Sequence, residues 1–131
     1  NLYTQLNLIT SEEGIEIFTK KLEDRFGKLP KEVTGLFNAL RIKWIAKRLG
    51  FEQVILKKNK LRCYFITDAQ SAYYDSPTFQ NLFKFIATQG ARKGFTIKKS
   101  YKNLLLAVDN VRGIGSAIGV LGQLEKVVDR K

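Results

Sequence analysis

The sequence feature that most constrains the fold is the heptapeptide Asp24-Arg25-Phe26-Gly27-Lys28-Leu29-Pro30, which lies between two stretches of helical periodicity. Glycine after the last periodic residue ends many helices because it accepts a positive φ. Proline is favoured in the first turn of a helix, where its missing N–H is not needed. Gly27 and Pro30 therefore predict a tight corner between two helices, with Phe26 and Leu29 as the apolar residues that anchor it.

The helix before this corner has a recognisable beginning at Thr10-Ser11-Glu12-Glu13. The Thr10 hydroxyl can accept a hydrogen bond from the backbone three residues on while the Glu13 side chain reaches back, which is the pattern of a capping box. The helix is predicted to run from there to about Phe26.

The helix after the corner is predicted over residues 30–49 and is ended by Gly50. Its apolar residues fall on two nearly opposite sides, one with Val33, Leu36, Phe37, Leu40 and Trp44 and the other with Ile42, Ile45 and Leu49. We therefore expect this helix to pack on two sides. Arg41 and Arg48 lie between the two stripes, where a partner could reach them.

Beyond Gly50 the apolar pattern changes from helical to extended. Two hairpins are predicted, over residues 54–66 with a turn at Lys58-Asn59 and over residues 95–108 with a turn near Lys102-Asn103. A helix that begins at Ser76-Pro77 and ends at Gly90 separates them, and a last helix begins between residues 113 and 116. We predict one α+β domain over residues 1–131. It has a helical part (1–50) with an N-terminal helical hairpin, and a sheet-plus-helix part (51–131) with an antiparallel sheet and a C-terminal helix.

Composition argues against catalysis and metal binding. The chain has no histidine and one cysteine, Cys63, which lies in an apolar stretch and has no histidine to act as its base. The usual ligands of zinc and most transition metals are therefore missing. Acidic residues gather on the first helices, where solvated faces explain them better than an acid–base pair. We predict no catalytic, cofactor-binding or metal-binding residues in this domain.

One segment resembles a dinucleotide-binding turn. Gly113-Ile114-Gly115-Ser116-Ala117-Ile118-Gly119 follows a predicted strand and opens a helix. Its glycine spacing departs from the fingerprint by one residue, and no acidic residue follows at the offset of about 20 residues that would hold a ribose. Close helix packing along Gly115, Gly119 and Gly122 is the preferred interpretation.

The chain is strongly basic, with a net charge of +11 that is concentrated in its middle. Residues 51–112 carry 11 basic and 4 acidic side chains. Such a surface favours polyanions or acidic proteins as partners. The candidate polyanion surface comprises Lys57, Lys58, Lys60, Arg62, Lys98 and Lys99. Aromatic residues interleave with these bases, as in proteins that bind single-stranded nucleic acid, but most of them fit core positions.

The corner resembles the signature of a known family. Leu22-Glu23-Asp24-Arg25-Phe26-Gly27-Lys28-Leu29-Pro30, followed by Leu49-Gly50, is similar to the pattern Leu-x-Asp-Arg-Phe-Gly-x-x-Pro, a helix, then Leu-Gly, of the C-terminal domain of bacterial transcription-repair coupling factors (Mfd). Leu2-Tyr3-Thr4-Gln5-Leu6 resembles the helix that precedes it there. The sequence similarity is strong over the first fifty residues. Beyond them, the hairpins and the last helix agree with the family in their layout more than in their sequence.

This resemblance implies a regulatory domain within a larger protein that couples transcription to DNA repair. The whole factor would be a helicase-type ATPase and DNA translocase, with ATP and Mg²⁺ bound in a motor upstream of this domain. It would release RNA polymerase stalled at DNA damage and recruit nucleotide-excision repair through UvrA. The C-terminal domain would act by autoinhibition, because it packs on the N-terminal module that binds UvrA and masks it.

Residue by residue, the resemblance places the interdomain interface at the end of the first helix and the corner. Lys21, Asp24 and Arg25 are its candidate residues, although relatives usually have an acidic residue where this chain has Lys21. The alternative is a basic accessory domain that contacts DNA. No apolar run of about 18 residues and no signal-peptide pattern occur, so we expect a cytoplasmic protein.

Overall fold

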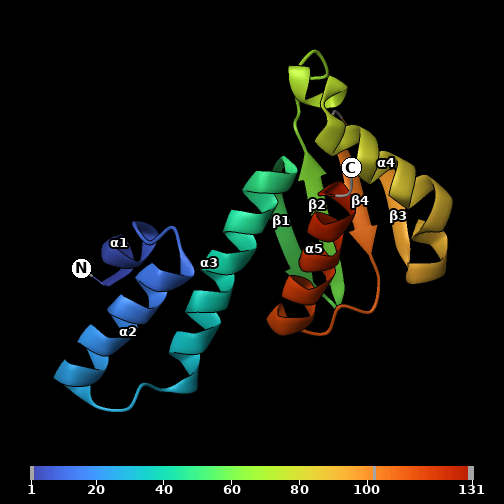
Figure 1. Ribbon diagram of the computed structural model, residues 1–131. Helices are drawn as coiled ribbons and strands as arrows, with labels where there is room; N and C mark the ends of the chain where they lie inside the picture. Colours follow the sequence, from blue (N-terminus) through green and yellow to red (C-terminus); the bar gives the residue numbers. More distant parts are fainter. Residues whose placement is uncertain (1, 102, 130–131) are drawn as a thin grey trace.

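The computed structural model describes residues 2–101 and 103–129, so Asn1, Lys102, Arg130 and Lys131 lie outside the described residues. Three helices come first: α1 (Leu2–Asn7), α2 (Glu12–Phe26) and α3 (Lys31–Leu49). They are followed by β1 (Phe51–Lys57), β2 (Lys60–Phe65), α4 (Pro77–Gln89), β3 (Phe95–Ser100), β4 (Asn103–Val108) and α5 (Ile114–Val128). Single 3₁₀ turns at Ala72–Asp75 and Gly90–Lys93 flank α4. The predicted α+β fold is confirmed (Figure 1).

The strands form one antiparallel sheet in the order β1-β2-β4-β3. The two hairpins meet through β2 and β4, so the central strands are the ones buried most deeply. Alternate residues of β2, Leu61, Cys63 and Phe65, are completely buried and face the helices. α3, α4 and α5 all contribute to the same core, so one face of the sheet is covered by helices.

The long helix α3 belongs to two separate cores. Its C-terminal half contributes Ile45, Ala46 and Leu49 to the large core beneath the sheet. Its N-terminal half contributes Phe37 and Leu40 to a small core with α1 and α2. The two apolar stripes on this helix therefore predicted its packing correctly. Leu36, which the sequence placed in the first stripe, is 38% exposed.

Both glycines at the ends of α2 and α3 have the positive φ that the sequence predicted. Gly27 has φ 78° and Gly50 has φ 89°. The two sites differ in their surroundings, because nothing lies within 4 Å of a Cβ built at Gly27. A Cβ at Gly50 would lie 2.1 Å from a ring carbon of Tyr73.

Two helix ends differ from the prediction. The side chain that caps α2 is Ser11, which accepts from the Gly14 N–H at 3.1 Å, and not Thr10. Pro30 is extended (ψ 161°) and precedes α3, which begins one residue later. Gly90 ends α4 as predicted, with a right-handed backbone that starts a 3₁₀ turn. At the two ends that differ, the element is correct and its end moves by one residue.

The predicted turn at Lys58-Asn59 is confirmed, since both residues have positive φ (53° and 62°). The second hairpin turns at Tyr101, whose φ is 54°. Of the two predicted turn residues, Asn103 begins β4 and Lys102 lies outside the described residues. The predicted close packing along Gly115, Gly119 and Gly122 is wrong, because a Cβ at any of them would have no atom within 4 Å. α5 packs on the core through Ala117, Leu121 and Leu124 instead.

Candidate protein interface on the first two helices

One face of α2 forms a groove with α1. Gly14, Ile17, Phe18, Lys21 and Arg25 recur at helical spacing along α2, and Gln5, Leu8, Ile9, Leu22 and Asp24 complete the lining. The groove has a volume of about 680 Å³. It brings together all three residues predicted for the interdomain interface, Lys21, Asp24 and Arg25. We call it the α1–α2 groove.

Two of the apolar side chains that line this groove are exposed to solvent. Leu8 is 75% exposed and Ile17 is 51% exposed. Lys21, Asp24 and Arg25 lie beside them, and each is exposed. None of these three charged residues has an ion-pair partner within 4.0 Å among the described residues. The groove therefore combines an apolar centre with a charged rim of mixed sign, which is the usual composition of a protein interface.

Phe26 does not anchor the corner, contrary to the prediction. Its side chain is 66% exposed, and the Arg25 guanidinium carbon lies 5.7 Å from the centre of its ring. Leu29 is half-buried, and Pro30 is exposed. The bend therefore depends on the backbone of Gly27 and Pro30, and Phe26 adds an exposed aromatic ring to the end of α2.

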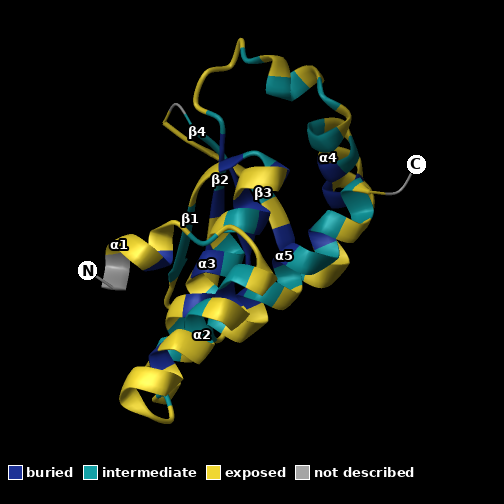
Figure 2. Cartoon of the chain, turned by 60° about the vertical axis from the view of Figure 1, so that its left-hand side comes forward, coloured by how far each residue is buried: buried dark blue, intermediate teal, exposed yellow. Residues whose placement is uncertain are grey.

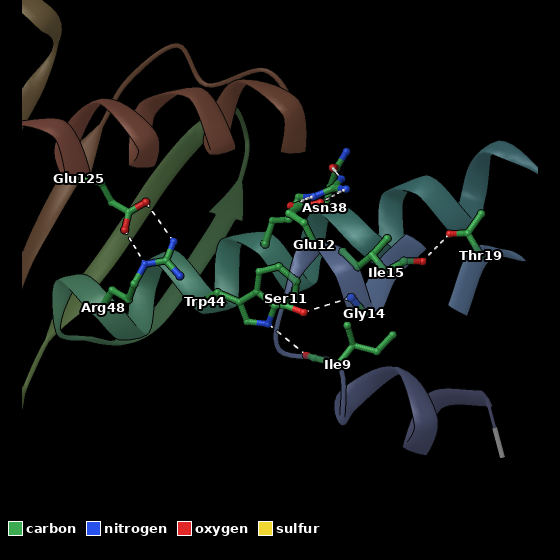
Figure 3. A network of polar contacts seen from close by, with 11 residues as sticks. Ile9, Ser11, Glu12, Gly14, Ile15, Thr19, Asn38, Trp44, Arg48 and Glu125 are labelled. Atoms are coloured by element: carbon green, nitrogen blue, oxygen red, sulfur yellow. Dashed lines mark hydrogen bonds and ion pairs between the residues drawn. The ribbon is translucent and has the colours of Figure 1, made fainter. Parts of the chain in front are cut away.

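Contacts with α3 hold α1 and α2 in place (Figure 3). The Trp44 indole N–H donates to the carbonyl of Ile9 at 3.3 Å, which fixes the α1–α2 connection against α3. A Cβ at Gly14 would lie 2.9 Å from the Ile9 side chain, so glycine allows this connection to approach α2 closely. Phe18 packs edge-on against Phe37 with their ring centres 6.2 Å apart. These contacts fix α1 and α2, which line the groove, relative to α3.

Arg41 and Arg48 hold the domain together and are not free for a partner, contrary to the expectation from their spacing. Arg41 donates to both carboxylate oxygens of Glu12, at 2.7 and 2.9 Å, and so ties α3 to α2. Arg48 donates to both carboxylate oxygens of Glu125, at 2.6 and 3.1 Å, and so ties α3 to α5. The hydrogen bond from Arg41 lowers the pKa of the Glu12 carboxyl below its usual value.

The six residues of the candidate polyanion surface do not all lie together. Lys57, Lys60, Arg62 and Lys98 lie on the face of the sheet opposite the helices, because their strand partners place them there. Lys58 lies in the β1–β2 turn. Lys99 pairs with Leu104 and lies near Tyr74, on the helix side of the sheet. Four of the six therefore share one face.

Chemically reactive groups are few in the described part of the chain. Burial raises the pKa of the Cys63 thiol to about 12, which disfavours the nucleophilic thiolate. Within residues 2–101 and 103–129, no three His, Cys, Asp or Glu side chains come together as a metal site would require. None of the helices described is long and apolar enough to span a bilayer.

The family model for the TRCF domain matches residues 1–76. This match covers more than half of the chain and includes the whole α1–α2 groove, the corner and the β1–β2 hairpin. The chain belongs to the TRCF domain family. The resemblance to the C-terminal domain of transcription-repair coupling factors is thereby confirmed, and membership connects the chain with transcription-repair coupling and DNA repair. No curated protein and no solved structure matches the chain.

Sequence reasoning identified the charged rim of the groove but not its apolar centre. Ile17 lies outside the stripe of Ile15, Phe18 and Leu22 that faces the helical core. An isoleucine on the polar side of an amphipathic helix was the available signal. The exposure of Leu8 could not be predicted from the sequence in this way, because it depends on how α1 packs on the other helices.

Proposed function

We propose that this TRCF domain regulates its parent factor by packing the α1–α2 groove on the module that binds UvrA, which masks that module until the factor engages RNA polymerase. The observation that carries the proposal is the exposure of Leu8 and Ile17 between charged residues in a preformed groove. Burial of these two side chains against a partner would contribute about 1 to 2 kcal/mol each. The choice of partner in this proposal rests on the resemblance to transcription-repair coupling factors.

The rim of the groove supports a reversible contact. Lys21 and Arg25 are basic and Asp24 is acidic, so the rim favours a partner surface of mixed charge and not a simple polyanion. A tethered contact needs little intrinsic affinity, because a flexible linker raises the effective concentration into the millimolar range. Weak binding would allow the domain to leave the module when the factor changes conformation.

The remaining functions belong to the parent protein in this proposal. An ATP-driven DNA translocase motor elsewhere in the protein would bind ATP and Mg²⁺ and release polymerase stalled at DNA lesions. The TRCF domain itself would have no catalytic role. Its buried thiol and the scarcity of reactive side chains described above support this division.

A competition experiment tests the masking. The UvrA-binding module is mixed with UvrA, and the complex is titrated with this chain. We expect the chain to lower UvrA binding in a saturable manner, and the double variant Leu8→Ser/Ile17→Ser to lose this effect. Phe83→Ser is the matched control, because Phe83 is also an exposed large apolar residue (46%) but lies on α4. Equal competition by wild type and double variant would contradict the proposal.

A further inference from the structure

Every charged residue on the face of the sheet opposite the helices is basic. Side chains alternate along each strand, so this open face is made by every second residue of 53–57, 60–64, 96–100 and 103–107. Four of these positions are basic, namely Lys57, Lys60, Arg62 and Lys98, and none is acidic. A sheet face with this composition attracts a polyanion.

The four cations are available for a ligand. All four side chains are exposed, and none forms an ion pair within 4.0 Å in the described residues. Asp109, directly after β4, also has no ion-pair partner within that distance among the described residues. Glu52 at the other end of the sheet accepts from the Thr67 N–H and hydroxyl, both at 2.9 Å. No internal carboxylate therefore neutralises the open face.

The strand register arranges the four cations along a diagonal. Lys57 and Lys60 are direct partners at the β1–β2 turn, and Arg62 follows two residues along β2, about 7 Å away. Lys98 lies two strands from β2, in the row that also contains Leu105 and Tyr64. Tyr64 is half-buried and lies next to the diagonal on the same face. The result is a narrow basic track with one aromatic ring beside it.

We propose that this open face binds single-stranded nucleic acid, with the phosphates on the basic track and a base stacked on Tyr64. Arginine suits phosphate because its planar guanidinium can donate two hydrogen bonds to it. Base stacking on an aromatic ring and a positive track for the backbone together define sequence-independent single-strand binding. The proposal goes beyond the masking function and does not depend on it.

The composition of the open face favours nucleic acid over an acidic protein. Of its apolar residues, Leu105 and Ala107 are buried, at 4% and 7% exposure, and Ile55 is half-buried, so no fully exposed apolar side chain remains for a protein partner. The α1–α2 groove, in contrast, has the exposed apolar residues Leu8 and Ile17 at its centre.

The test is the binding of a labelled oligothymidylate of about 12 nucleotides to the full chain, measured by fluorescence anisotropy at several salt concentrations. The triple variant Lys60→Gln/Arg62→Gln/Lys98→Gln should bind at least about tenfold more weakly at about 50 mM salt. The slope of log K against log salt should become shallower by about 2, since each phosphate contact on a single strand contributes about 0.7. Tyr64→Leu should weaken binding by about fivefold or more.

The matched control is Lys20→Gln/Lys84→Gln/Lys126→Gln, which removes three exposed charges from α2, α4 and α5. It should retain nearly the wild-type affinity and slope. Equal weakening by both triples would overturn the proposal, because binding would then depend on net charge alone. Absence of binding at low salt would also overturn it, as would tighter binding of a duplex of equal length. Circular dichroism confirms that each variant is folded.

Discussion

The helical part and the sheet part of this domain differ in how completely they bury their apolar residues. In the described chain, the small helical core has four buried residues, whereas the core beneath the sheet has seventeen. Among the described residues, four of the six exposed large apolar side chains, Leu8, Ile17, Phe26 and Leu36, belong to the helical part. Figure 2 shows that much of α1 and α2 is exposed. The sheet part is therefore self-sufficient and displays charge, and the helical part is incompletely buried and displays apolar surface.

The largest expected effect is in the sheet part. Leu121→Ala removes a completely buried side chain from α5, which packs on α3 and α4, and should lower the free energy of unfolding by about 2 to 5 kcal/mol. Urea unfolding followed by circular dichroism measures this. Leu8→Ala, at an exposed position, should change the stability by less than about 0.5 kcal/mol. A small effect of Leu121→Ala would show that the large core does not dominate stability.

The two positive-φ glycines allow a matched comparison of the corner with the junction between the parts. Gly27→Ala should cost about 1 to 3 kcal/mol from backbone strain alone. Gly50→Ala should cost more, because its Cβ would displace the Tyr73 ring, whose hydroxyl donates to the Leu49 carbonyl at 2.6 Å. The two values come from the same urea experiment. Equal costs would mean that the Tyr73 ring moves aside freely.

A substitution in the small core should act locally. Ile15→Ala, at 4% exposure, should lower the free energy of local opening by about 2 kcal/mol. Hydrogen exchange should accelerate in α1, α2 and the N-terminal half of α3. Labelling of the buried Cys63 thiol under native conditions should stay as slow as in the wild type, because Cys63 belongs to the other core. Faster Cys63 labelling would mean that the two parts open together.

The smallest effect concerns the ion pair that joins α2 to α3. Glu12→Gln should lower the stability by less than about 1 kcal/mol at pH 7, since the Glu12 side chain is 63% exposed. Arg41 lowers the folded-state pKa of Glu12, so this contribution is present above the carboxyl's unfolded pKa and is lost as pH falls through its folded pKa. Urea unfolding at several pH values, with Glu13→Gln as the control, measures the difference. A difference that does not shrink as the pH falls below the carboxyl's unfolded pKa would contradict this account.

Local signals predicted most of the elements, and long-range packing decided the rest. The corner at Gly27 and the turn at Lys58-Asn59 were predictable because positive φ is a local requirement. The strand order was not, because the β2–β4 contact joins segments about forty residues apart. Period-two alternation already implied that Lys98 and Lys99 point to opposite faces of the sheet, although both were assigned to one basic surface because they are neighbouring lysines.

The candidate site was predictable in its charges but not in its shape. Asp24 and Arg25 follow from the family pattern, from which Lys21 departs, and all three line one groove. The exposure of Leu8 and Phe26 depends on how α1 and the corner sit on α3, which no local pattern specifies. Apolar residues that remain exposed in a folded domain can be recognised only after the core is known.

Calorimetric titration of this chain into the UvrA-binding module tests the central claim most directly. We predict weak, saturable binding that is lost in Leu8→Ser/Ile17→Ser and retained in Lys60→Gln/Arg62→Gln/Lys98→Gln. The first pair removes the apolar centre of the α1–α2 groove, and the second set alters only the open face of the sheet. Absence of binding at high concentration, or binding that depends on the sheet residues and not on the groove, would contradict the account.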